Sequence, residues 1–230
     1  MSSTQVESGV PAQTRTEPVQ PAMPAMPAET AVTSLPSLAS GIPTSVFGFA
    51  IVITMLSLAN TGILDTNALF IPVAMVVGFG AIGIGGLFEI RNGDLFGGTF
   101  GIVYAVFLLS TGIALKFFSP PATADAKTAS AFGEALGSYF LLWALISVFF
   151  TIAALLVNKT ATIAFALLAT VLLLAGLANV VGGSSASGLT KAAGWAGLAD
   201  GVAAFWLAGG IMLNTLHGRD LMPLGARRVS

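Results

Sequence analysis

Residues 69–104 read LFIPVAMVVGFGAIGIGGLFEIRNGDLFGGTFGIVY, and this stretch decides the fold. It opens with an apolar run that carries no charge before Glu89, where we expect the chain to meet water. A short polar turn follows, and a second apolar run begins near Phe96. Because a helix needs about 20 apolar residues to cross a bilayer, the stretch predicts two membrane-spanning helices joined by a tight, charged loop.

Both predicted helices are rich in glycine. Small residues allow membrane helices to approach closely, so we interpret these positions as packing surfaces. One run also matches the dinucleotide fingerprint GxGxxG. That fingerprint needs a strand before it and a helix that opens at it. Here the glycines lie inside a continuous apolar helix, so we reject a dinucleotide site. The glycines are Gly78, Gly80, Gly83, Gly85 and Gly86 in the first helix, and Gly97, Gly98 and Gly101 in the second.

The composition excludes a water-facing surface. The chain has 230 residues, of which 55% are hydrophobic and 8% charged, and its mean hydropathy is +0.91. A soluble domain carries roughly 25% charged residues, so the solvent is a lipid bilayer. Cysteine is absent, which excludes disulfides, thiolate metal sites and thiol catalysis. We expect no cofactor and no metal, and a net charge of -1 gives no indication of a nucleic-acid partner.

The predicted fold class is an all-α integral membrane protein with six transmembrane helices. Residues 1–43 are rich in Pro, Ala, Ser and Thr, and predict a disordered cytoplasmic tail. Residues 44–215 form the transmembrane domain, with GGSSASG as a flexible link before the last helix, and residues 216–230 form a short polar tail. The expected spans are about 44–64, 67–88, 96–117, 135–157, 160–181 and 193–213.

The distribution of Lys and Arg predicts that both termini are cytoplasmic. Segments on the inner side, counted from an inner N-terminus, carry six basic residues and outer segments carry three. Because inner loops are enriched in basic residues, this orientation is favoured for a multi-pass protein of the plasma membrane. The inner residues are Arg15, Arg91, Lys159, Arg219, Arg227 and Arg228; the outer ones are Lys116, Lys127 and Lys191.

Asp200 is the single charged residue in the cores of the predicted spans. A carboxylate there costs about 2.5–3.5 kcal/mol on insertion scales. Two interpretations remain open: Asp200 couples protons or gates anions, or it lies near the outer interface and is merely hydrated. Asn60 and Asn179 are polar candidates for lining a solute path, and no catalytic constellation is visible. The chain therefore predicts passage of small solutes and no enzyme activity.

Several stretches resemble the acetate uptake transporter family, which includes succinate–acetate permeases and yeast ammonia/acetate exporters. The order and spacing of these stretches carry the resemblance. They are EIRNGDLFGGTFGIVY (89–104), LSLANTG (56–62), GSYFLLWALISVFF (137–150), AGWAGLADG (193–201) and LMPLG (221–225). The chain departs from the family at SGIPTS (40–45), where only Pro43 of the entrance signature Asn-Pro-Ala-Pro-Leu-Gly remains, and this leaves the substrate open.

The resemblance implies a homohexamer in which each subunit holds its own pathway. It further implies a constriction of Phe49, Tyr104 and Leu168, an entrance at Pro43, and a substrate-size position at Ala204.

The predicted function is membrane passage of acetate, related small monocarboxylates and succinate. A carboxylate loses its hydration in an apolar neck, so acetate crosses either as the neutral acid with a proton or as an anion. Asn60, Thr99 and Asn179 would then replace water on each side of a short constriction. The alternatives are a pathway for another small solute, such as ammonia, and a non-transporting membrane scaffold or sensor that works through its proline-rich tail.

Overall fold

The computed structural model describes residues 39–66 and 68–225, which belong to one compact unit, Ser37–Ser230. Six helices in this part of the chain are long and apolar enough to cross a membrane, which confirms the predicted all-α membrane fold. The predicted tail lies outside the described residues over 1–38, as do Arg15, Arg227 and Arg228.

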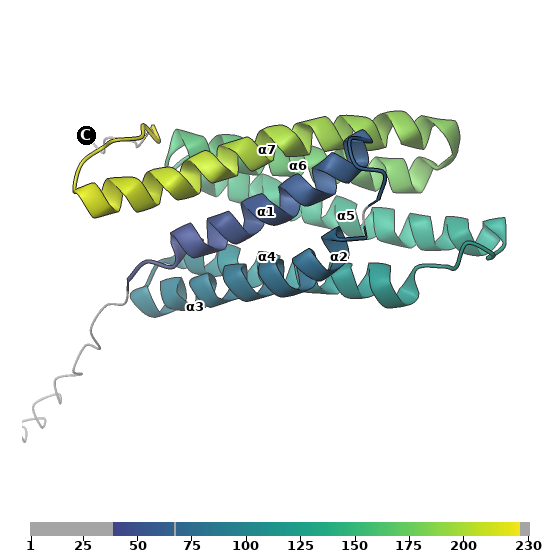
Figure 1. The fold of residues 1–230 in the computed structure, drawn as a ribbon, viewed down its shortest axis with the longest axis horizontal. Helices are drawn as coiled ribbons and strands as arrows, with labels where there is room; N and C mark the ends of the chain where they lie inside the picture. The colour runs from purple at the N-terminus through teal and green to yellow at the C-terminus, as the bar shows by residue number, and fades with distance from the viewer. Residues whose placement is uncertain (1–38, 67, 226–230) are drawn as a thin grey trace, which may run out of the picture. The chain divides into compact units, whose positions relative to one another are not determined.

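The six spans are built from nine helical elements (Figure 1). The second span combines three of them and the third combines two, so each runs on without a loop. The elements are α1 (Ile42–Thr61), α2 (Phe70–Val73), η1 (Ala74–Ile82), α3 (Gly83–Asn92), α4 (Leu95–Ile113), η2 (Ala114–Phe118), α5 (Ala126–Ala154), α6 (Lys159–Val181) and α7 (Gly183–His217).

The helices pack as neighbours around a central axis. On one side α1 lies along α7, α7 along α6, and α6 along α5. On the other side α4 lies along η1 and α3, and η1 closes onto α1. Figure 1 shows α1 crossing in front, with α6 and α7 above it and α3 and α4 below. The described chain begins and ends at the same end of this bundle, as an even number of spans requires.

Glycine brings the second and third spans into backbone contact. A Cβ on Gly86 would lie 2.6 Å from Cα of Gly101 and 2.8 Å from its carbonyl carbon. Similarly, a Cβ on Gly78 would lie 2.7 Å from a methyl carbon of Leu108. These contacts confirm the packing interpretation of the glycine pattern. Gly80 differs, because nothing lies within 4 Å of the position that its Cβ would take.

The second span contains a stretch of π-helix. Residues 74–82 form η1, directly after Pro72 in the short α2. The span ends at Asn92, and Gly93 follows with φ +80°. A left-handed residue of this kind ends a helix at no steric cost when it is glycine. The tight turn predicted between the second and third spans is therefore made by Gly93 and Asp94, and Asp94 caps α4 by accepting from the amide of Gly97 (3.0 Å).

Two predicted helix starts are wrong. α5 begins at Ala126 rather than near residue 135, because Asp125 caps it by accepting from the amide of Thr128 (3.0 Å). α7 begins at Gly183 rather than near residue 193. Gly182 and Gly183 have positive φ angles, so the chain reverses within two residues and the small side chains that follow continue as helix. The predicted flexible link GGSSASG is thus part of α7 from Gly183 onward.

The first turn of α5 is expected to be sensitive to pH. Hydrogen bonds from the Thr128 hydroxyl and amide hold the pKa of Asp125 below its usual value. A lowered folded-state pKa means that the cap stabilises the helix above the unfolded-state pKa and is lost as the pH falls through the folded-state pKa. The melting-temperature difference between wild type and Asp125→Ala should therefore shrink in acid. A difference that stays constant with pH would contradict this.

Residues 218–225, within the predicted polar tail, form a strap along the end of the bundle. After Gly218 the chain turns back along α7, and Asn214 holds it there. The Asn214 side chain accepts from the amides of Leu221 (2.8 Å) and Met222 (2.9 Å) and donates to the carbonyl of Met222 (2.8 Å). The strap ends on α6, where the amide of Thr160 donates to Leu224 (3.2 Å).

Asn214→Ala is expected to release this strap. Three hydrogen bonds of about 0.5–1.5 kcal/mol each predict a loss of about 1.5–4.5 kcal/mol in strap closure. Hydrogen exchange at the amides of Leu221 and Met222 should become faster, because these amides lose their acceptor on Asn214. The matched control is Thr215→Ala, since the Thr215 hydroxyl donates only to Ile211 within α7. Equal exchange rates in both variants would contradict the role of Asn214.

Candidate functional site

A first chamber of about 150 Å³ lies toward the end of the bundle at which α1, α4 and α6 begin. Most of its lining is apolar, and its polar groups come from the three helix starts. α7 closes the chamber with small and aliphatic side chains. The lining residues are Ser40, Ile42, Val46, Phe49, Asp94, Phe96, Phe100, Val157, Asn158, Ala161, Ala164, Phe165, Leu168, Ala204, Leu207 and Ile211.

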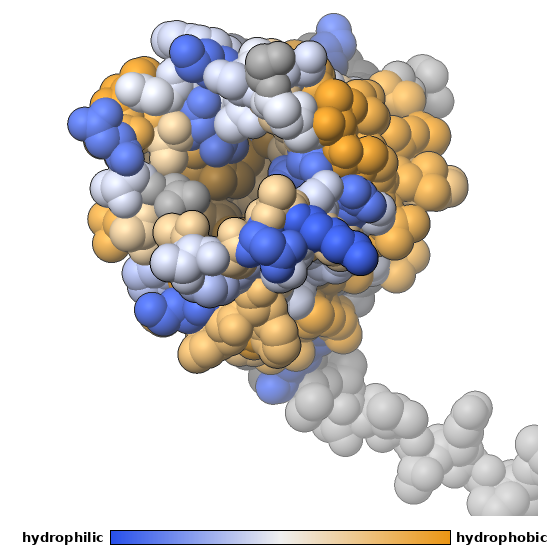
Figure 2. Space-filling view, turned by 90° about the vertical axis from the view of Figure 1, so that its right-hand side faces the viewer, coloured by the Kyte–Doolittle hydropathy of each residue, from blue (hydrophilic) through white to orange (hydrophobic). Residues whose placement is uncertain are grey.

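A second chamber of about 270 Å³ lies toward the opposite end. Figure 2 looks onto that end and shows a recess bordered by hydrophilic residues, with hydrophobic residues on the flanks. This chamber holds two amide side chains. The lining residues are Phe49, Val52, Ile53, Leu56, Asn60, Phe70, Phe107, Leu108, Thr111, Leu115, Leu136, Phe140, Leu168, Val171, Leu172, Ala175, Asn179 and Thr190.

Phe49 and Leu168 line both chambers, and among the described residues no other side chain does. Phe49 projects from the middle of α1 and is 6% exposed; Leu168 projects from the middle of α6 and is 2% exposed. The ring of Phe100 stands edge-on to Phe49 at a centroid distance of 6.3 Å. We call Phe49 and Leu168 the neck, because this pair separates two chambers that reach toward opposite ends of the bundle.

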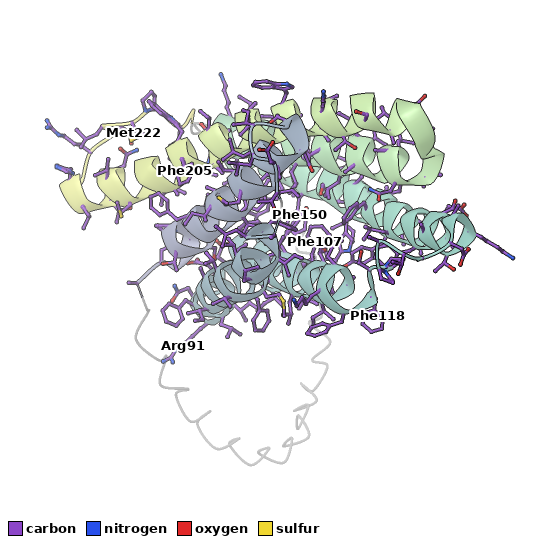
Figure 3. All side chains as sticks on the ribbon, turned by 45° about the vertical axis from the view of Figure 1, so that its right-hand side comes forward. Arg91, Phe107, Phe118, Phe150, Phe205 and Met222 are labelled. Carbon is purple, nitrogen blue, oxygen red and sulfur yellow. The ribbon has the colours of Figure 1, made fainter. Side chains whose placement is uncertain are left out.

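An aromatic cluster supports the neck from the α4 and α5 side. Figure 3 shows Phe107 and Phe150 in the middle of the bundle. The ring of Phe107 packs on Trp143 of α5 at 4.5 Å, and Phe150 stacks on Phe165 of α6 at 5.2 Å with their planes 16° apart. These large side chains fill the space between α4 and α5 and fix the wall opposite α1 and α7.

Tyr104 belongs to this cluster and lines neither chamber. Its ring lies between Phe100 (5.4 Å) and Phe150 (5.4 Å), and the residue is fully buried. Its hydroxyl lies 2.7 Å from the Ser147 hydroxyl, which donates to the carbonyl of Trp143 (2.8 Å). Since a serine hydroxyl has one proton, Tyr104 donates to Ser147. The phenol is therefore satisfied within the wall.

Three of the other predicted pathway residues line a chamber, and two do not. Ala204 lies in the first chamber, and Asn60 and Asn179 lie in the second. Thr99 lies in neither; it is exposed on an apolar groove at the outside of α4 and α5. Pro43 lies in the first turn of α1 beside the chamber-lining Ile42, where its fixed φ suits a helix start.

Glu89 is buried, which corrects the expectation that it meets water. It is 4% exposed, and its carboxylate accepts from the Ser40 hydroxyl (2.8 Å) and from the amide of Gly41. It thus ties the end of the second span to the start of α1, at the mouth of the first chamber. An acidic group at a helix N-terminus is stabilised by the helix dipole, which explains how a carboxylate is tolerated there.

Asp200 lies at the centre of α7, equally far from Gly183 and His217. It is fully buried, and neither carboxylate oxygen has a hydrogen-bond partner among the described residues. Lys191 lies about 14 Å before it along the helix axis. Because α7 begins well before the predicted span, the interpretation of Asp200 as a hydrated group near the interface is not supported.

Sequence reasoning missed several residues of the site, including Ser147, Phe100, Phe165 and Thr111. An apolar residue in a membrane helix gives no sign of whether it faces lipid, another helix or a cavity. Thr111 is 2% exposed and lines the second chamber, and its hydroxyl has no partner in the described part of the chain. Residues 39–66 and 68–225 contain no group of three or more His, Asp or Glu side chains that could hold a metal.

Comparison with known proteins adds family information. The model of the GPR1/FUN34/yaaH family matches residues 24–217. The succinate-acetate/proton symporter SatP of Escherichia coli is 29% identical over 188 residues, which cover 82% of this chain and 96% of that protein. An uncharacterised protein of Methanothermobacter thermautotrophicus is 29% identical over 190 residues, covering 80% and 90% respectively. The structure of the bacterial acetate channel SatP matches with a TM-score of 0.72 at 28% identity, covering 82% of this chain and 99% of that one.

Proposed function

Because the chain belongs to the GPR1/FUN34/yaaH family, we propose that it passes acetate and related small monocarboxylates across a membrane through the two chambers and the neck between them. The observation that carries this proposal is that Phe49 and Leu168 line both chambers. The relatives named as an acetate/proton symporter and an acetate channel support the substrate class. We expect no enzymatic activity, in keeping with these names.

The neck favours a small solute that carries little charge. Its two side chains are apolar, and neither chamber is lined by Lys, Arg or His in the described part of the chain. An anion would be held weakly, and burying it without a partner is costly. Movement as the neutral acid, or as an anion accompanied by a proton, avoids that cost. We therefore favour proton-linked passage over a conductive anion path.

The polar groups at the two ends fit the same solute. The starts of α1, α4 and α6 border the first chamber, and the N-terminus of a helix carries a partial positive charge. Glu89, Asp94 and Asn158 occupy part of these termini by accepting amide hydrogens. In the second chamber the amides of Asn60 and Asn179 offer both donors and acceptors. A carboxylic acid can exchange hydrogen bonds with such groups on each side of the neck.

We further propose a homohexamer in the plasma membrane with both termini in the cytoplasm. Large apolar side chains cover the outside of the bundle, among them Phe149 (65% exposed) and Val76 (71% exposed), and such a surface suits lipid and neighbouring subunits. The described residues at the two ends carry equal numbers of Lys and Arg, so the orientation depends on the terminal arginines of the sequence.

Labelled acetate uptake into proteoliposomes tests the proposal. The expected result is uptake well above protein-free vesicles, with accumulation beyond equilibrium when an inward proton gradient is imposed under a clamped membrane potential. Rapid equilibration without accumulation would identify a passive anion channel. Uptake equal to that of protein-free vesicles would contradict the function, and a parallel assay with ammonium would then test the alternative solute.

A further inference from the structure

We propose that Asp200 is the proton-binding site of this transporter, an inference that rests on the proposed passage of monocarboxylates. The carboxyl group lies in the middle of the membrane-spanning α7, fully buried and without a hydrogen-bond partner among the described residues. The proposed pathway leaves this group without a role, since it lines neither chamber.

The surroundings of Asp200 identify the proton as its ligand. An ionised carboxylate buried without partners costs several kcal/mol or more. α1 carries no charged or titratable side chain, and α6 carries only Lys159 at its start. On α7 itself the titratable side chains are Lys191 and His217, near the two ends. Because no cation compensates Asp200 from either helix packed against α7, the neutral carboxyl is the form that fits this packing.

The site lies beside the contact between α1 and α7. Residues three and four apart share one face of a helix, so Asp200 lies next to Gly197, and Gly201 follows it directly in the chain. The two glycines meet α1, where the hydroxyls of Ser57 and Thr54 fill the space above them. The Ser57 hydroxyl is also buried and without a partner in the described part of the chain. Ser57 on α1 and Asp200 on α7 are thus two buried polar side chains without a partner among the described residues, on two helices that pack against each other.

The site also lies close to the neck. Ala204, one turn after Asp200, lines the first chamber, and Ile53, one turn after Phe49, lies 3.7 Å from the position of a Cβ on Gly201. When the carboxylate binds a proton it becomes the neutral carboxyl, and when it releases the proton it regains its charge. The two forms differ in their demand for water beside the neck, which links proton binding to substrate passage.

Infrared spectroscopy of the reconstituted full-length protein tests the site directly. Ordinary aspartates titrate near pH 3.9, so they are ionised at neutral pH. Wild type labelled with ¹³C at its aspartate carboxyl groups should show, at neutral pH, a protonated-carboxyl band that shifts with the label; Glu89 is excluded because glutamate is not labelled. The band should be absent from Asp200→Asn and present in the matched control Asp220→Asn, whose side chain is exposed. Absence of the band from wild type would overturn the proposal, even if Asp200→Asn fails to fold.

Transport separates this inference from the proposed function. Asparagine resembles the protonated carboxyl, so Asp200→Asn should keep acetate exchange at equilibrium but lose accumulation driven by the proton gradient. Asp220→Asn should accumulate acetate as wild type does. Wild-type accumulation by Asp200→Asn would overturn the assignment of Asp200 while leaving acetate passage intact. Absence of flux in wild type would instead overturn the proposed function, and the infrared band would still decide whether Asp200 holds a proton.

Discussion

Leu168→Ala should widen the neck and admit longer monocarboxylates. Leu168 lines both chambers from the middle of α6, and alanine removes the branched end of its side chain. Lowering the barrier for a longer acid by about 1.4 kcal/mol raises its rate of passage about tenfold. We therefore expect the ratio of butyrate to acetate uptake to rise by about tenfold. The stability cost should lie toward the low end of about 2–5 kcal/mol, because the side chain already borders a cavity.

The opposite change gives the matched comparison. Ala204→Leu adds volume to the first chamber beside the neck and should lower uptake of longer acids more than that of acetate. Leu145→Ala removes the same atoms as Leu168→Ala from the outer surface of α5, where Leu145 is 56% exposed, and should leave the preference unchanged. An unaltered substrate profile in both Leu168→Ala and Ala204→Leu would refute the neck.

Gly86→Ala should be strongly destabilising. A Cβ at this position would meet the backbone of Gly101 on α4 at 2.6 Å, and a backbone cannot rotate away as a side chain can. Overpacking typically costs about 1–3 kcal/mol and sometimes more, and here we expect the upper end of that range. The measurement is the thermal midpoint of the detergent-solubilised protein together with its yield as a monodisperse species.

Gly80→Ala is the control for this effect. It makes the same chemical change in the same span, but nothing lies within 4 Å of the new methyl group. Since alanine is favoured over glycine in helices by about 1 kcal/mol, the variant should be neutral or slightly more stable. Equal loss of stability in the two variants would show that Gly86 and Gly101 do not set the spacing of the second and third spans.

Much of the fold could be predicted from the sequence because lipid imposes a simple rule on it. Uncharged apolar runs identified all six spans, and the glycine pattern indicated that the second and third spans pack closely against a neighbour; the structure shows that they contact each other at Gly86 and Gly101. The errors came where composition gives no such signal. The residues GGSSASG are small and polar, so they suggested a loop, yet Gly182 turns the chain and α7 starts at once. Similarly, Asp125 starts α5 in a stretch that is too polar to count as a span.

The residues of the site were harder to predict from the sequence than the fold. Helical periodicity cannot tell which apolar face lines a cavity, since lipid, helix and cavity all accept the same residues. The family resemblance directed attention to Phe49 and Leu168, and the structure brings these two together. The resemblance also placed Tyr104 in the constriction. In the structure the Tyr104 hydroxyl is hydrogen-bonded to Ser147, and the phenol lies in the aromatic wall. Glu89 was read as an end of a span because a charge usually marks water; its partners Ser40 and Gly41 come from a distant part of the chain.

Thiol modification at the neck tests the central claim most directly, because the chain contains no cysteine of its own. Leu168→Cys is reconstituted, treated with a small methanethiosulfonate reagent, and assayed for acetate uptake, with modification verified by mass spectrometry. Leu145→Cys on the exposed outer side of α5 is the matched control. We predict that modification abolishes uptake by Leu168→Cys, that acetate slows the reaction there, and that Leu145→Cys keeps its uptake. Full uptake by completely modified Leu168→Cys would show that acetate does not pass between Phe49 and Leu168.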